Sequence, residues 1–270
     1  MQSKVTEIVS KVKNYGIAIY QNWLTNEDLE ISKKIVNDIN CLKGDYRGIF
    51  EPGIKYKLVE VFLKLRFKNL KYTNYFFNLS KKLGLKNNAS ENFITESKFV
   101  RADCWVSPIS DKPVLDWHFD YAYSGAKNVT KYISPKKQTI KFFFYLSDVT
   151  SDNGCLSYIP NSHFISIALR KGIYEKSIKY TPYWKLNDFR NTILIDENYN
   201  YLKKNVDPKI LSNFLVETEP SSIKNGTSTK YDCQPIKAGG AVIFNDAGAH
   251  RGSKTLLNKR LALRFFFRKK

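Results

Sequence analysis

The chain of 270 residues contains 44 Lys and Arg against 25 Asp and Glu, so its formal net charge is +19. A hydrophobic fraction of 43% allows a substantial core and excludes wholesale disorder, while the longest apolar runs, such as residues 142–146, are too short to cross a bilayer. Four cysteines without a CxxC pair disfavour a zinc site or a disulfide framework, and residues 1–16 lack the apolar core of a signal peptide. We therefore expect a cytoplasmic protein with no membrane span.

The excess of positive charge has two interpretations. A basic surface attracts nucleic acids and other anions. However, Lys and Arg are spread along a chain that is also rich in Asn, Ile, Tyr and Phe, as AT-rich coding produces. We favour the second interpretation by about two to one. What remains is the expectation of an electropositive active-site mouth that favours an acidic substrate.

Residues 1–97 are expected to form a support of helices and a strand. Residues 16–23 alternate like a short strand, and a helix is predicted to follow with Thr25 as its N-cap and Asp28 as the acidic partner. A second helix is predicted over residues 57–83, where apolar residues and Lys interleave without Gly or Pro.

From residue 98 onward the pattern changes to short strands. They are predicted at residues 99–106, 115–121, 139–146, 156–159, 241–245 and 260–267. Such a series favours a sandwich or barrel over a βαβ fold. The strands fall into two stretches, 98–163 and 236–268, separated by a long polar segment with scattered aromatic residues, 164–235, which is typical of an insertion or lid. Without an internal repeat or a linker, residues 1–270 are expected to form a single domain.

All three histidines of the chain lie in strand or turn contexts. His118 and Asp120 form an HxD pattern, and residues two apart on a strand point to the same side, so both can bind one ion. His250, which follows the strand over 241–245, can supply a third ligand. Two imidazoles and one carboxylate on one face of an octahedron leave three positions open, which a 2-oxo acid and O2 can fill. An HxD pattern alone arises by chance in about one such chain in seven, so its context decides.

Arg260 begins the last predicted strand, ten residues after His250. A guanidinium matches a carboxylate with two parallel hydrogen bonds and does not lose its proton, which suits the distal carboxylate of 2-oxoglutarate. Arg264 lies on the same face of that strand, so the pattern leaves open which of the two arginines does this. A surface arginine in a basic chain is the simpler interpretation of either.

Further motifs surround these residues. They are residues 143–150 (FFYLSDVT), 152–156 (DNGCL), 159–163 (IPNSH), 239–244 (GGAVIF) and 250–253 (HRGS). In this combination the chain resembles the phytanoyl-CoA dioxygenase (PhyH) family of Fe(II)/2-oxoglutarate-dependent oxygenases. Asn161 stands where the family has Gly, a tolerable change in a turn. The resemblance covers most of the chain except about 42–95 and 164–235.

The resemblance implies a fold that is mainly β with flanking helices (α+β), namely a double-stranded β-helix of the jelly-roll or cupin-like type. The implied metal ligands are His118, Asp120 and His250, and the residues implied to contact 2-oxoglutarate are Arg260, Thr139 and Ser253. His163, in the turn motif, is expected to be structural.

The resemblance also implies the chemistry. Halogenating relatives carry a small residue at the position of Asp120, which leaves room for chloride, so a carboxylate there favours hydroxylation. The expected enzyme consumes 2-oxoglutarate and O2, releases succinate and CO2, and hydroxylates a small, preferably anionic molecule. Substrate contacts are expected from the lid, among Arg170, Lys171, Tyr174, Tyr180, Tyr183 and Trp184.

Two alternatives stay open at this point. An oxygenase that modifies nucleic acid also uses HxD and a distant His, but it needs a continuous basic groove with stacking aromatic residues. A cupin-like binding protein without catalysis would take up no Fe(II).

Overall fold

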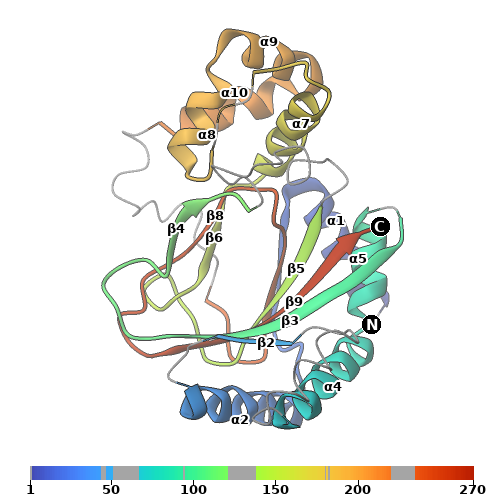
Figure 1. The fold of residues 1–270 in the computed structure, drawn as a ribbon, viewed down its shortest axis with the longest axis vertical. Helices are drawn as coiled ribbons and strands as arrows, with labels where there is room; N and C mark the ends of the chain where they lie inside the picture. The colour runs from blue at the N-terminus through green and yellow to red at the C-terminus, as the bar shows by residue number, and fades with distance from the viewer. Residues whose placement is uncertain are drawn as a thin grey trace.

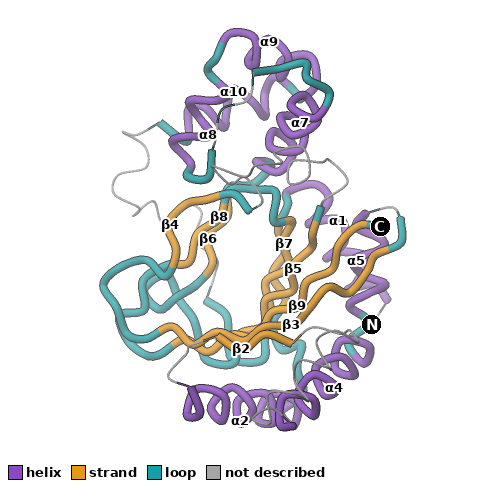
Figure 2. Tube along the Cα trace, in the orientation of Figure 1, coloured by secondary structure: helices purple, strands orange, loops and turns teal. Residues whose placement is uncertain are grey.

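The computed structural model describes residues 2–43, 47–50, 67–93, 95–120, 138–179, 181, 183–219 and 235–270. Two antiparallel sheets face each other (Figures 1 and 2). The larger has the strand order β1 (Ile17–Tyr20), β7 (Ala241–Asn245), β5 (Thr139–Tyr145), β9 (Arg260–Lys269), β3 (Ser97–Ser107) and β2 (Arg47–Phe50). The smaller has the order β4 (Leu115–His118), β8 (His250–Gly252) and β6 (Leu156–Tyr158). This is the expected jelly-roll type of α+β fold, although the described strands do not close into a barrel.

Helices cover the outer face of the larger sheet (Figure 1). They are α1 (Gln2–Tyr15), α2 (Asn26–Lys43), α4 (Phe67–Lys82) and α5 (Leu85–Phe93). Along β5, Phe142 and Phe144 pack against these helices, whereas Phe143 and Tyr145 belong to the core between the sheets. Because the central strand is buried on both faces, its residues 142–145 form a continuous run of aromatic residues that does not alternate with polar ones.

The start of α2 confirms the predicted cap. The Asp28 backbone N–H donates to Thr25 Oγ1 at 3.1 Å, and that hydroxyl donates to Asp28 Oδ2 at 2.8 Å. Lys82, at the end of α4, binds the same carboxylate at 2.7 Å. The cap therefore also joins α2 to α4.

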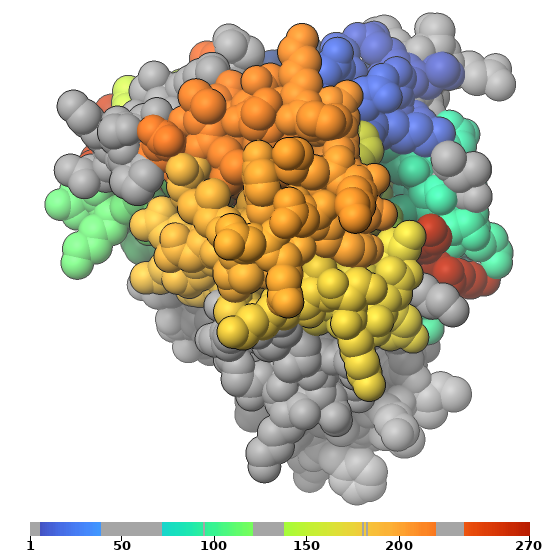
Figure 3. Space-filling model, turned by 90° about the horizontal axis from the view of Figure 1, so that it is seen from above, coloured from blue at the N-terminus to red at the C-terminus, as the bar shows by residue number. Residues whose placement is uncertain are grey.

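The segment expected as an insertion contains helices of its own. They are α7 (Ser162–Tyr174), α8 (Leu186–Ile193), α9 (Asp196–Asn205) and α10 (Pro208–Glu217). Their apolar faces form a second core around Phe189, and this core extends to Trp117 and Phe119 below them. Seen from that end, the yellow and orange atoms of these helices cover the middle of the face (Figure 3). Of the segment's described aromatic residues, Tyr183, Phe189 and Phe214 thus belong to this core, and Tyr199 and Tyr201 pack against it.

Several boundaries differ from the prediction. The helix predicted over 57–83 is α4, Phe67–Lys82, in the described residues, and its first part lies outside them. The strand predicted over 115–121 ends at His118. Besides the helices α7 to α10, the prediction lacks α1, α5, β2 and β8; these two strands have 4 and 3 residues, too few for a readable alternation. No described helix has the length and hydropathy needed to span a membrane.

Candidate active site

A cavity with about 600 Å³ of empty space, its open mouth included, lies between the two sheets. Strands of both sheets line it, with His118 and His250 from the smaller sheet and Lys141, Arg260 and Arg264 from the larger.

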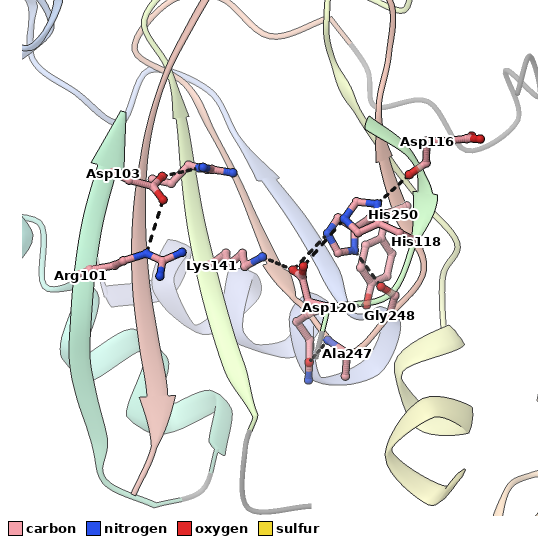
Figure 4. A network of polar contacts seen from close by, with 12 residues as sticks. Arg101, Asp103, Asp116, His118, Asp120, Lys141, Ala247, Gly248 and His250 are labelled. Atoms are coloured by element: carbon pink, nitrogen blue, oxygen red, sulfur yellow. Dashed lines mark hydrogen bonds and ion pairs between the residues drawn. The ribbon is translucent and has the colours of Figure 1, made fainter. Parts of the chain in front are cut away.

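The two histidines come from adjacent strands, because His118 on β4 pairs in register with His250 on β8. Each is oriented by a backbone carbonyl two residues before it: His118 Nδ1 lies 2.7 Å from the oxygen of Asp116, and His250 Nδ1 lies 2.9 Å from that of Gly248. With Nδ1 donating in both rings, the lone pair of each Nε2 is available to a metal. The ring centroids are 4.3 Å apart, and Figure 4 shows both rings directed at Asp120.

Asp120 lies two residues beyond the end of β4. Phe119 between the two ligands turns away and packs on Phe189 of α8, with ring centroids 4.0 Å apart. The Asp120 carboxylate therefore returns to the side of His118, at 3.8 Å from its Nε2, and lies 3.4 Å from Nε2 of His250. One ligand atom from each of the three residues lies within 4.8 Å of the others. Two imidazoles and a carboxylate at this spacing fit a metal such as Fe(II).

The electrostatics keep these ligands in the forms that bind a metal. Burial, and then the neighbouring His250, lower the pKa of His118 to about 3, so its imidazole is neutral. Burial opposes ionisation of Asp120, but Lys141 and the two histidines hold the pKa of its carboxyl well below the usual value. Lys141 Nζ is in direct contact with Asp120 Oδ2 (Figure 4).

Arg260 and Arg264 both reach the cavity from β9, but their partners differ. Arg260 is buried and donates from Nη1 to the Gly154 carbonyl at 2.7 Å and from Nη2 to Ser107 Oγ at 2.9 Å. Arg264 donates from Nε to the fully buried Asp103 at 2.5 Å. Gly154 has φ +77°, and a Cβ there would lie 2.7 Å from Arg260 Cδ, so the DNG motif needs its glycine for conformation and for space.

The remaining predicted site residues lie elsewhere. Thr139 is buried at the start of β5, and Ser253 is buried with its hydroxyl 3.4 Å from Cys155 Sγ; neither is among the described residues that line the cavity. A contact of either with 2-oxoglutarate stays a prediction. His163 is buried on α7 beside Phe164, apart from the metal-ligand group. Asn161 has φ 65°, the left-handed conformation that explains a glycine at this position of the motif.

The helical segment contributes to the site through two of its predicted contacts. Arg170 on α7 is buried and donates from Nη2 to the Asp120 carbonyl at 2.6 Å. The Trp184 carbonyl accepts from the Phe119 N–H at 3.0 Å, and its indole lies 5.7 Å from the His118 ring. In contrast, Tyr183 is a buried core residue. Lys171 and Tyr174 are exposed, and Tyr180 lies outside the described residues.

Sequence reasoning missed two charged residues beside the metal ligands. Lys141 is 8% exposed and Asp246 is fully buried. Both stand in or directly after strands that are otherwise buried and mainly apolar, TIKFFFY and AVIFN. A charge in such a run is costly unless it is paired, and this signal could have identified them.

Comparisons with known proteins agree with this geometry. No curated protein matches the chain in sequence. Among solved structures, the chain is similar to the epimerase SnoN in complex with Fe3+, alpha-ketoglutarate and nogalamycin RO (TM-score 0.57, 10% identity, 100% of this chain and 85% of that one). It is also similar to the carbocyclase SnoK from nogalamycin biosynthesis (TM-score 0.53, 12% identity, 97% and 83%). A third similar structure is HygX from Streptomyces hygroscopicus with nickel and 2-oxoglutarate bound (TM-score 0.52, 11% identity, 98% and 86%).

These structural likenesses, at such low identity, establish the fold. The sequence profile of the family described as Phytanoyl-CoA dioxygenase (PhyH) matches residues 75–256, more than half of the chain. That stretch includes all three members of the metal-ligand group. The chain therefore belongs to the phytanoyl-CoA dioxygenase family.

Proposed function

We propose that this chain is a hydroxylase that uses Fe(II), 2-oxoglutarate and O2 to oxidise a small anionic molecule. The observation that carries the proposal is the meeting of His118, Asp120 and His250 on one side of a cavity whose other wall bears arginines. These three residues are the proposed iron ligands. Arg260 is the proposed partner of the distal carboxylate of 2-oxoglutarate.

The residues of the chain do the positioning in this reaction. Iron supplies the redox chemistry toward O2, which amino-acid side chains lack. The backbone carbonyls beneath His118 and His250 fix both rings with Nε2 toward the metal. Apolar side chains of the cavity, such as Phe143 and Phe244, exclude water from the reacting atoms.

The charge of the cavity supports an anionic substrate. Of the described residues that line it, four are cations, and Asp120 is the one carboxylate. Arg260 is assigned to 2-oxoglutarate, which leaves Arg264 for the substrate. Its guanidinium lies 5.2 Å from the centroid of the Trp105 ring and 5.6 Å from that of Phe143, so aromatic faces border the cation. A carboxylate or phosphate beside an apolar or ring-bearing group fits this wall.

Residues 164–235 are proposed to act as a lid on a single-domain enzyme. The support is that Arg170 and Trp184, from this segment, contact the metal-ligand residues or the residue between them. Ordering of these contacts on substrate binding would shield the reaction from water.

Hydroxylation is the proposed outcome because a protein carboxylate occupies the third ligand position. SnoN is described as an epimerase and SnoK as a carbocyclase, so the product itself must be identified. A gain of one oxygen atom supports hydroxylation. Loss of two hydrogens indicates cyclisation or desaturation, and unchanged mass with inverted configuration indicates epimerisation.

The first test is an anaerobic titration of the protein with Fe(II) and 2-oxoglutarate, followed by visible absorption. A metal-to-ligand charge-transfer band is expected in the wild type and lost in His118→Ala. The matched control is His163→Gln, which changes a buried histidine outside the metal-ligand group and should keep the band. Lack of Fe(II) uptake by the wild type would favour the cupin-like binding protein instead.

The second test addresses the substrate. Succinate release is measured across a panel of carboxylates and phosphates, each with a neutral analogue. Faster release with the anions supports the proposal. Steeply salt-dependent binding of DNA or RNA, with succinate release on those polymers, would favour the nucleic-acid-modifying oxygenase.

A further inference from the structure

Two charged side chains near the proposed iron site are not among its ligands. Lys141 belongs to β5, all seven residues of which are buried. Asp246, directly after β7, is fully buried. Isolated charges are rarely buried in this way, so the two residues need an explanation together with the metal ligands.

The register of the larger sheet makes these residues neighbours. Lys141 pairs with Phe244 across β5 and β7, and the Asp246 N–H donates to the Thr139 carbonyl at 3.1 Å. Asp246 lies opposite Thr139, two residues before Lys141 on β5. Asp246 and Lys141 are therefore on the same face of the sheet, in neighbouring pairs of that face. A diagonal separation of this kind is within reach of a lysine side chain.

Lys141 has two carboxylates near it but contacts one of them. Its ammonium is on Asp120 (Figure 4). Within the described part of the chain neither oxygen of Asp246 has a hydrogen-bond partner of good geometry, although the nearby Thr139 backbone lowers its pKa. Burial accordingly raises the pKa of Asp246 to about 7, although the nearby charge of Lys141 opposes the rise. Burial alone would lower the pKa of Lys141, but Asp120 and Asp246 together raise it.

We propose that Lys141 is a displaceable counter-ion of the iron site: it neutralises Asp120 while the site is empty and turns to Asp246 when a divalent metal takes the Asp120 carboxylate. The inference rests on the proposed metal ligands and names two further positioning residues. A metal ion on Asp120 repels an ammonium at contact distance, and this repulsion is strong where water is excluded. Asp246 is a carboxyl group already in place to receive that ammonium.

Lys141 therefore competes with the metal, and Asp246 weakens this competition. The competition stabilises the empty site, since a partly buried carboxylate such as Asp120 is destabilised when it has no counter-ion. It also predicts opposite effects of two substitutions on metal affinity. Lys141→Met should tighten metal binding, and Asp246→Asn should weaken it.

The experiment is titration calorimetry with Co2+ alone, at fixed pH and without 2-oxoglutarate. Lys141→Met is expected to bind Co2+ about tenfold more tightly than the wild type, and Asp246→Asn about tenfold less tightly, which are effects of a single close charge. The variant that carries both Lys141→Met and Asp246→Asn completes a double-mutant cycle. With Met at 141, the effect of Asp246→Asn should shrink to about threefold or less, because Asp246 then acts on the metal only through space.

Two controls make the result decisive. Arg264→Gln removes a cation from the same cavity that is paired with Asp103, and its Co2+ affinity should stay within about threefold of the wild type. Lys141→Gln serves if Lys141→Met shows altered circular dichroism. Weaker Co2+ binding in both Lys141 variants would overturn the inference, because Lys141 would then support Asp120 in the loaded site; additive effects in the cycle would overturn it as well. If His118→Ala binds Co2+ as well as the wild type, the proposed metal site itself is wrong.

Discussion

The two sheets that face the cavity contribute different chemistry. The smaller sheet, with strands of 3 or 4 residues, carries His118 and His250, and backbone carbonyls orient both rings. The larger sheet has long buried strands and carries the cations Lys141, Arg260 and Arg264. Metal ligation needs local backbone geometry, which short strands next to turns can provide. Anion binding needs guanidinium groups fixed by buried partners, which a sheet packed on both faces can provide.

The largest expected loss of activity comes from removing one of the metal ligands on the smaller sheet. In His250→Ala the metal loses a direct ligand, so succinate release should fall by more than the roughly 10- to 100-fold that loss of an outer hydrogen bond costs. The charge-transfer band with Fe(II) and 2-oxoglutarate should disappear as well. Activity within tenfold of the wild type would contradict the assignment of His250.

The role of the larger sheet in anion binding is tested by replacing each of its two arginines separately. Arg260→Gln should raise the Kd for 2-oxoglutarate by about 10- to 100-fold, because charge-assisted hydrogen bonds are lost. Its affinity for Co2+ alone should change little. Arg264→Gln should leave the Kd for 2-oxoglutarate within about threefold of the wild type and raise the KM for an anionic substrate. A larger 2-oxoglutarate effect in Arg264→Gln would reverse the two assignments.

A smaller effect is expected where the backbone supports Arg260. Gly154→Ala places a methyl group 2.7 Å from Arg260 Cδ at a φ of +77°, and we expect a loss of about 2–4 kcal/mol in the free energy of unfolding. The matched control is Gly84→Ala, at φ +65° with no atom within 4 Å of the added Cβ, which should lose about 1 kcal/mol. Urea denaturation measures both. Equal losses would show that crowding against Arg260 has no part in the effect.

The same division explains how much of the fold was predictable. Long strands such as β3 and β9 have enough residues for their apolar pattern to be recognised, and they were placed to within a few residues. The three-residue β8 has no such pattern and exists through its pairing with β4 and β6. The helices after residue 162 were missed because they are short and their aromatic residues, Phe189 among them, pack on Phe119 from a distant part of the chain.

The candidate site shows the same limit. The grouping of His118, Asp120 and His250 was predicted because an HxD pattern and a distant His stand among several motifs that resemble one family. Lys141 and Asp246 were missed because their proximity depends on the register between β5 and β7, which no local motif encodes. The choice between Arg260 and Arg264 was open for a related reason: both face the cavity, and only their partners separate them.

The smallest expected effect is on the pH dependence of stability and comes from His163. This residue is a histidine of the core, in contrast to the two proposed metal ligands. Burial lowers the pKa of His163 to about 4, so the unfolded chain binds its proton more readily than the folded one. The neutral imidazole of His163 therefore makes its full contribution to the free energy of unfolding above pH 6.5. This contribution is lost as the pH falls toward 4. Between pH 6.5 and 5 the wild type should lose about 1–2 kcal/mol more than His163→Gln, measured by urea denaturation at each pH. Parallel pH dependences would mean that His163 has the same pKa in the folded and unfolded chain, so that its hydrogen bond to the Lys13 carbonyl, which raises the pKa, offsets its burial.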